Sequence, residues 1–116
     1  MAAQFVHLSP HIHCPDVDAC LQFRGRSFVW NADKAASNLQ KHKLSFERAC
    51  EVSLDPLMKL WDASVLHGRR LAAVGTTLDR DVLFVVHIEM EEGGLVRVIS
   101  ARYATRSERE TYEVDG

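Results

Sequence analysis

Hydrophobic and polar residues alternate with a two-residue period along most of the second half of the chain, as they do in half-buried β-strands. We expect strands at residues 57–61, 70–76, 82–89 and 95–101, separated by short turns that contain glycine or aspartate. Such short turns favour antiparallel pairing of neighbouring strands. Residues 82–86 are apolar at every position, which predicts a central strand that is covered on both faces.

Helical spacing is found before and after these strands. A short strand at residues 28–30 is followed by a helix that we expect to end near residue 43, and a second short helix stops before Pro56. The expected N-caps of the three helices are Asn31, Ser45 and Thr105. Thr105 forms a capping box with Glu108, so the chain closes with a helix. The prediction is an α+β fold: an antiparallel sheet of about four strands, packed by two N-terminal helices and a C-terminal helix.

The first part of the chain shows no sustained period. We therefore expect residues 1–27 to form an N-terminal extension outside the fold and residues 28–116 to form the domain, since 116 residues suit a single hydrophobic core. The extension contains several possible metal ligands: His7, His11, His13, Cys14 and Cys20. Because their spacing matches no regular metal site, we expect no metal and no cofactor.

The charge of the chain is slightly negative overall but unevenly distributed. It has 14 lysines and arginines against 16 aspartates and glutamates, a net charge of −2, which works against strong nonspecific binding of nucleic acid. Residues 95–112 nevertheless contain four arginines: Arg97, Arg102, Arg106 and Arg109. No apolar run is long enough to span a bilayer and no secretion signal is visible, so a cytoplasmic location is expected.

The first predicted helix combines several groups that can handle phosphate. Lys34, Asn38 and His42 recur every four residues, and Lys41 lies beside them, so all four project to roughly one side. Cleavage of RNA without a metal requires removal of a proton from the 2′-hydroxyl, stabilisation of negative charge on phosphorus and protonation of the leaving oxygen. Lysine, histidine and arginine can supply these roles. The alternative is that these side chains only form the solvated face of an amphipathic helix.

Arginines at the ends of two strands complete the candidate site. By alternation Arg102 shares a face with Val98, where it needs an anionic partner, either a phosphate or the carboxylate of Asp33 or Glu108. Arg97 lies on the opposite face. Arg70, at the start of its strand, could face the same groove. Arg106 lies in the first turn of the closing helix, where a cation is unfavourable to the helix dipole and invites a functional explanation.

Short motifs in a fixed order support this interpretation. They are Phe28-Val29-Trp30, Lys34, Asn38, Lys41-His42, Ser45-Phe46-Glu47, Ala49, Asp55-Pro56, Arg70, Ala73-Val74-Gly75, Arg97-Val98-Ile99-Ser100-Ala101-Arg102, Ala104-Thr105, Glu108-Arg109 and Tyr112. With these motifs the sequence resembles, over residues 28–112, the BrnT family of bacterial type II toxins, which are small ribonucleases with a RelE-like fold.

The resemblance implies a metal-independent endoribonuclease, similar to mRNA interferases, that cleaves RNA to inhibit translation. It also implies a cognate BrnA-like antitoxin with a ribbon-helix-helix DNA-binding part, through which the complex would bind operator DNA. The catalytic residues carried over are Lys34, His42, Arg70 and Arg102, and the RNA-binding residues are Lys41, Arg97 and Arg106. The alternative is a noncatalytic module of the same fold that docks an acidic partner or acts as a corepressor.

Overall fold

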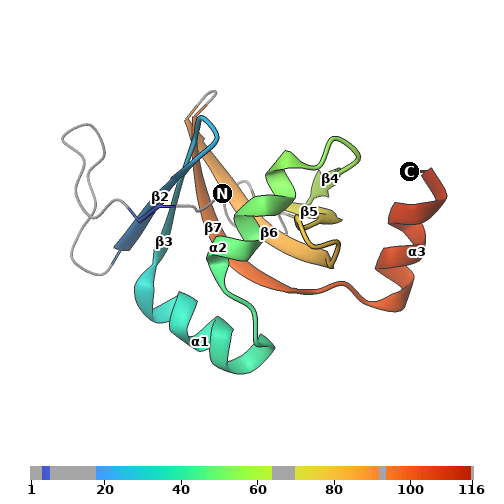
Figure 1. Ribbon diagram of the computed structural model, residues 1–116, viewed down its shortest axis with the longest axis horizontal. Helices are drawn as coiled ribbons and strands as arrows, with labels where there is room; N and C mark the ends of the chain where they lie inside the picture. The colour runs from blue at the N-terminus through green and yellow to red at the C-terminus, as the bar shows by residue number, and fades with distance from the viewer. Residues whose placement is uncertain (1–3, 6–17, 64–69, 92–93, 116) are drawn as a thin grey trace.

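The computed structural model describes residues 4–5, 18–63, 70–91 and 94–115 (Figure 1). Its elements are β1 (Gln4–Phe5), β2 (Asp18–Phe23), β3 (Arg26–Asn31), α1 (Ala32–His42), α2 (Phe46–Cys50), the 3-10 helix η1 (Glu51–Leu54), β4 (Lys59–Asp62), β5 (Arg70–Thr76), β6 (Val82–Glu91), β7 (Leu95–Tyr103) and α3 (Arg106–Asp115). Within the described residues the strands form one seven-stranded sheet in the order β1-β2-β3-β7-β6-β5-β4. The α+β class is confirmed. No helix in these ranges is long and apolar enough to cross a membrane.

The sheet is mixed. Strands β4 to β7 follow one another through antiparallel pairs, as the alternation predicted. Strand β3, however, lies parallel to β7, with residues 27–29 beside residues 95–97. The expectation of about four antiparallel strands is therefore wrong in the number of strands and in the direction of one pair. Hydrophobic alternation indicates which face of a strand is buried, but it does not indicate which strand lies next to it.

Strand β2 corrects the expectation that residues 1–27 lie outside the fold. It pairs with β3 along its whole length, and Leu21 and Phe23 on it are buried in the core with 1% and 5% of their surface exposed. Arg24 and Gly25 form the turn with φ angles of 50° and 83°, the left-handed conformation that tight hairpins require. This strand is short and lies among turn-forming residues, which hid its alternation. Residues 1–3 and 6–17 of the predicted extension lie outside the described residues.

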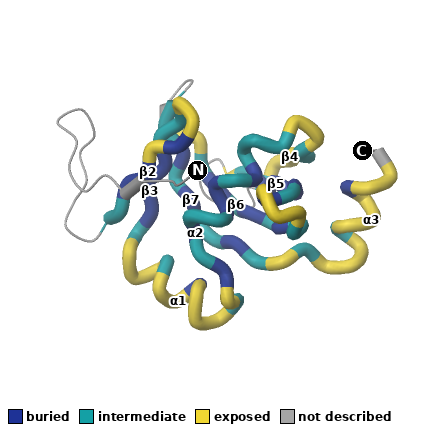
Figure 2. Tube along the Cα trace, viewed as in Figure 1, coloured by how far each residue is buried: buried dark blue, intermediate teal, exposed yellow. Residues whose placement is uncertain are grey.

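The two faces of the sheet differ in what covers them. We call inner the face on which α2 and η1 pack, and it carries most of the core: Leu21, Phe28, Trp30, Leu83, Val85, Val96, Val98 and Ala101. Trp30 packs edge-on against Phe46 of α2, with ring centroids 5.9 Å apart. Figure 2 shows the strands behind α2 as largely buried, whereas α1 and α3 are largely exposed. We call the opposite face of the sheet outer.

All three predicted helix caps are confirmed. Asn31 Oδ1 accepts a hydrogen bond from the backbone N–H of Lys34, and Ser45 Oγ accepts one from the N–H of Arg48. Thr105 and Glu108 form the predicted capping box, in which each side chain accepts from the other residue's backbone N–H. These local contacts explain why the helices begin where the sequence predicted.

Helix α3 lies at the right of the view, beside β5, whereas α1 lies below the sheet (Figure 1). Tyr112 on α3 donates a hydrogen bond of 2.6 Å to Asp55, whose carboxylate also accepts from the backbone N–H groups of Thr76 and Leu57. Burial raises the pKa of Asp55, but these hydrogen bonds outweigh burial and leave the pKa below its usual value. Asp55 thus joins α3 to β5 through an ionised carboxylate.

Candidate active site

Three of the predicted arginines lie on the outer face of the sheet. Arg70 on β5 is opposite Ile88 on β6, and Ile88 is opposite Arg97 on β7. Phe84 lies four residues before Ile88 on β6, so the two side chains point to the same face, and Phe84 is opposite Arg102. Because residues paired across a sheet point to the same side, Arg70, Arg97 and Arg102 share one face. Neighbouring strands are about 4.8 Å apart, so the backbones of Arg70 and Arg97 are separated by roughly 10 Å.

A β-bulge in β7 places Arg102 on this face. The sequence predicted Arg102 on the face of Val98, which is the inner face. On β6, however, Val86 lies opposite Ser100 while the next residue, His87, lies opposite Val98, so β7 contains one extra residue at this point. An extra residue reverses the alternation beyond it. The predicted face of Arg102 is therefore wrong, and the bulge unites Arg102 with Arg97.

Arg102 is held by a carboxylate and an aromatic ring. Its two terminal nitrogens donate hydrogen bonds of 2.8 and 2.9 Å to the two oxygens of Glu108, and its guanidinium lies 4.1 Å from the centroid of the Phe84 ring. The bond to Glu108 raises the pKa of Arg102, and the same bond lowers the pKa of Glu108. Of the partners considered from the sequence, Glu108 is thus the one present. One of the terminal nitrogens of Arg102 also donates to the carbonyl of Tyr103 over 3.3 Å. Within the described residues the Nε–H of Arg102 makes no hydrogen bond, which leaves it to a ligand.

Both predicted RNA-binding arginines, Arg97 and Arg106, are also paired. Arg97 donates to Asp18 of β2 over 3.0 Å, and the Asp18 side chain is only 8% exposed. Arg106 pairs with Glu110 one turn along α3, with 87% of the Arg106 side chain exposed. The sequence suggested no partner for Arg97, because Asp18 lies in the segment that was expected to be outside the fold.

Helix α1 is attached to β7 immediately beside Arg102. The side-chain amide of Asn38 donates 2.8 Å to the carbonyl of Ala101 and accepts 3.2 Å from the N–H of the same residue. It also donates to the carbonyl of Leu44. Asn38 is 8% exposed, so the prediction that it projects with the cations of α1 toward a ligand is wrong. Its role in the structure is to hold α1 against the strand.

The cations of α1 surround this attachment. Lys34 and Lys41 are exposed and His42 is half-buried. Within the described part of the chain their side chains make no ion pair or hydrogen bond, unlike Arg97 and Arg102. These three groups are therefore available to a ligand that binds between α1 and the end of β7.

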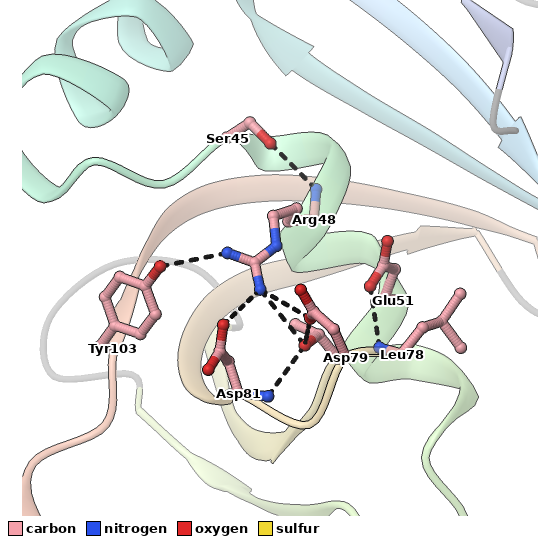
Figure 3. A network of polar contacts seen from close by, with 8 residues as sticks. Ser45, Arg48, Glu51, Leu78, Asp79, Asp81 and Tyr103 are labelled. Carbon is pink, nitrogen blue, oxygen red and sulfur yellow. Dashed lines mark hydrogen bonds and ion pairs between the residues drawn. The ribbon is translucent and has the colours of Figure 1, made fainter.

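Sequence reasoning missed Arg48, which forms the most extensive polar network of the described residues (Figure 3). It donates to Asp81 over 2.6 Å, to Asp79 over 2.8 Å and to the hydroxyl of Tyr103 over 3.1 Å. The hydrogen bond to Asp81 raises the pKa of Arg48 against the opposing effect of burial. Arg48 thereby ties α2 to the turn between β5 and β6 and to the end of β7. Two aspartates in one predicted turn were the available signal for a nearby cation.

Two hollows among the described residues lie on the inner face, one of them between α1, α2 and the sheet. The other has a cavity volume of about 40 Å³ and is lined mainly by apolar residues of α2, η1 and the sheet, together with His87, Arg26 and Glu89. Among the described residues no cluster of three or more histidine, cysteine, aspartate or glutamate side chains could hold a metal ion. The histidines and Cys14 of the predicted extension lie outside the described residues. The arginines of the outer face are thus separate from the apolar hollow.

A family model matches residues 30–108, and it describes the ribonuclease toxin, BrnT, of type II toxin–antitoxin systems. The chain belongs to the BrnT family. A solved structure, the 1.1 Å crystal structure of the Brucella abortus ribonuclease toxin BrnT, is similar with a TM-score of 0.53 and 26% sequence identity. The likeness covers 66% of this chain and 94% of the Brucella chain. No protein of curated function matches the sequence significantly.

Membership of the BrnT family places this chain among the ribonuclease toxins of type II toxin–antitoxin systems. An RNA substrate and a cognate antitoxin are the partners that the family implies. The matched residues contain α1 and strands β4 to β7, and with them every residue of the candidate site. Strand β2 precedes the matched residues, so Asp18 lies outside the part that this chain shares with the family model.

Proposed function

We propose that this BrnT family member is a metal-independent endoribonuclease that cleaves RNA to inhibit translation and is neutralised by a cognate antitoxin. The observation that carries the proposal is the pair of hydrogen bonds between Asn38 and Ala101. Because α1 is fastened to the residue that precedes Arg102, we infer that the cations of α1 and the guanidinium of Arg102 border the same region. A scissile phosphate bound there would contact both elements.

The proposed chemistry needs only side chains of this chain. The 2′-oxygen of a nucleotide loses its proton and attacks the adjacent phosphorus, and the bond to the 5′-oxygen breaks as that oxygen gains a proton. Lys34 or His42 takes up the first proton and supplies the second. The products are a 2′,3′-cyclic phosphate and a 5′-hydroxyl. Arg102 and Arg70 stabilise the negative charge that develops on the phosphorane oxygens. The contact of Arg102 with the Phe84 ring and its two hydrogen bonds to Glu108 support this role, since they hold the guanidinium in place before RNA binds.

RNA would extend from this point along the outer face. Lys41 on α1, Arg97 on β7 and Arg106 at the start of α3 are the proposed contacts to neighbouring phosphates. Arg106 is well exposed, whereas Arg97 must first give up its carboxylate partner. The proposed antitoxin is a BrnA-like protein with a ribbon-helix-helix part, through which the complex would bind operator DNA.

A noncatalytic function is the second candidate. Arg97 and Arg102 already bind carboxylates, and the net charge of the chain is −2. An acidic segment of a partner could replace Asp18 or Glu108 on the outer face, and the chain would then act as a docking module or as a corepressor in a DNA-bound complex.

Cleavage of RNA by the purified protein in the presence of a chelator distinguishes these functions. The ribonuclease proposal expects fragments that end in 2′,3′-cyclic phosphate. Arg102→Gln should lower the rate by about 100-fold to 1,000-fold, the usual cost of removing one group that stabilises developing negative charge. Arg109→Gln removes an equal charge from an exposed position of α3 and should leave the rate nearly unchanged.

Because Arg102 also binds Glu108, its replacement could loosen α3. Lys34→Gln provides the second variant, since Lys34 is exposed and its side chain makes no contact within the described residues that could hold the fold together. Intact RNA after prolonged incubation with folded wild-type protein, or full activity in both variants, contradicts the proposal and favours the docking module.

A further inference from the structure

The ion pair between Asp18 and Arg97 joins a strand of the N-terminal hairpin to the proposed RNA-binding face. We propose that Asp18 competes with RNA phosphate for Arg97 and so sets the affinity of this toxin for RNA. The inference rests on the proposed function, because it concerns how the same face binds its substrate. It assigns a role to a residue outside the stretch that matches the family model.

The ion pair between Asp18 and Arg97 is short and largely buried. Asp18 Oδ2 lies 3.0 Å from a terminal nitrogen of Arg97, and the exposed fractions of the two side chains are 8% and 29%. Asp18 is opposite Asn31 at one end of the β2–β3 pair, and Leu21 and Phe23 anchor the same strand in the core. Packing of the strand therefore holds the Asp18 carboxylate near Arg97, so that forming the ion pair costs little conformational entropy.

The direction of the contact opposes RNA binding. In the sheet β2 lies two strands from β7 on one side, whereas β5, which carries Arg70, lies two strands from β7 on the other side. Arg97 reaches toward β2 and hence away from Arg70. A phosphate between Arg70 and Arg97 would require Arg97 to leave Asp18 and turn toward β6.

RNA phosphate can replace the Asp18 carboxylate on Arg97 because guanidinium binds both anions in the same way. Carboxylate and phosphate oxygens accept the same charge-assisted hydrogen bonds from guanidinium. When phosphate takes Arg97, however, Asp18 is left as a poorly solvated carboxylate without its partner, which is unfavourable. The folded chain thus opposes phosphate binding at this position, and replacing Asp18 by a neutral residue removes that opposition.

Binding of a fluorescein-labelled single-stranded DNA oligonucleotide tests the proposal, since DNA lacks the 2′-hydroxyl and is not cleaved. Fluorescence anisotropy would be measured at several salt concentrations. Asp18→Asn should tighten binding severalfold and steepen the slope of log K against log salt by about 0.7, the value for one more phosphate contact to a single strand. Glu113→Gln, which changes net charge equally on exposed α3, should have a much smaller effect.

A double-mutant cycle assigns the effect to Arg97. In an Arg97→Gln background Asp18→Asn should no longer tighten binding. Asp18→Ser serves as a second variant, and thermal unfolding checks that each protein is folded. The proposal is overturned if the Asp18 variants bind the oligonucleotide with the affinity of the wild type, or if neither the wild type nor these variants bind it. It is also overturned if Asp18→Asn still increases the affinity in the Arg97→Gln background.

The outcome is separable from that of the ribonuclease proposal. If wild-type protein cleaves RNA but Asp18→Asn changes neither affinity nor slope, the role of Asp18 fails and the enzyme remains. If neither the wild type nor any variant cleaves RNA but the effect of Asp18→Asn on oligonucleotide affinity depends on Arg97, the ribonuclease proposal fails and the competition of Asp18 for Arg97 remains.

Discussion

Asn38 makes hydrogen bonds that a β-strand would otherwise make. The parallel pairing of β3 with β7 includes Val29 and Arg97 and does not continue beyond them, so the next part of β7 presents N–H and C=O groups at an open edge. At Ala101 the amide of Asn38 satisfies both groups. An amide can do so because it carries a donor and an acceptor side by side. The Asn38 side chain thus attaches α1 to the edge of β7 and fixes the position of the cations on that helix.

Replacement of Asn38 by alanine should therefore be costly. It would leave the N–H and C=O of Ala101 and the C=O of Leu44 without their present partners, and each buried polar group left unsatisfied costs about 1–3 kcal/mol. Partial access of water reduces the sum, so we expect a loss of about 2–4 kcal/mol in the free energy of unfolding, measured by urea denaturation. Ser37→Ala on the exposed side of the same helix should change it by less than about 0.5 kcal/mol. Equal stability of the two variants would contradict this role of Asn38.

At the scale of elements, the N-terminal hairpin is part of the sheet and of its core. Strand β2 covers the edge of β3 that would otherwise be open, and its inward side chains join the same cluster as those of β3 and β7. The hairpin also brings Asp18 over the outer face. Strand β2 therefore connects two properties of the molecule, the stability of its core and the charge of its proposed binding face.

A core mutation in β2 tests the first property. Leu21→Ala should lower the free energy of unfolding by about 2–5 kcal/mol, the range for large-to-small changes at fully buried positions. Leu21 is 1% exposed, whereas its neighbour Gln22 points outward and is exposed. Gln22→Ala is thus a matched control that should be nearly neutral. A neutral Leu21→Ala would indicate that β2 is not bound to the core in solution.

At the scale of the whole molecule, acidic residues from both ends of the chain flank the arginines of the outer face. Asp18 comes from the N-terminal hairpin and Glu108 from the C-terminal helix. The two contacts connect the ends of the chain to the middle of the sheet, where Arg97 and Arg102 lie. The chain's own carboxylates thus partly neutralise the arginines of the outer face, in keeping with a net charge of −2.

Protonation of His87 should contribute to the pH dependence of the free energy of unfolding. Burial on the inner face lowers the pKa of His87 below its usual 6.5, although Glu89 acts in the opposite direction and Arg26 in the same one. As pH falls through 6.5, the unfolded chain takes up a proton before the folded protein does, so the free energy of unfolding decreases toward lower pH. This contribution is constant above pH 6.5 and is lost below it. His87→Gln should flatten this decline in denaturation experiments carried out at a series of pH values from above 6.5 downward, and an unchanged slope would contradict it.

Local sequence was sufficient for much of the architecture. The caps at Asn31, Ser45 and Thr105, strand β5 at residues 70–76 and the helical nature of α3 follow from residues only a few positions apart. Alternation and capping depend on such short distances, so they can be recognised in one stretch of chain. The kinds of side chain available for RNA chemistry follow from composition and spacing in the same way.

The faces and partners of those side chains depend on contacts between distant residues. The bulge that turns Arg102 outward is visible only against β6, and β2 is recognised as a strand by its pairing with β3. Asp18 and Arg97 are 79 positions apart, and Asn38 and Ala101 are 63 apart. A pairing of this kind leaves no periodic signal in either segment, because each segment's pattern records only whether a side chain is buried. The three-dimensional arrangement therefore decides which cations are paired within the protein and which are open to a ligand.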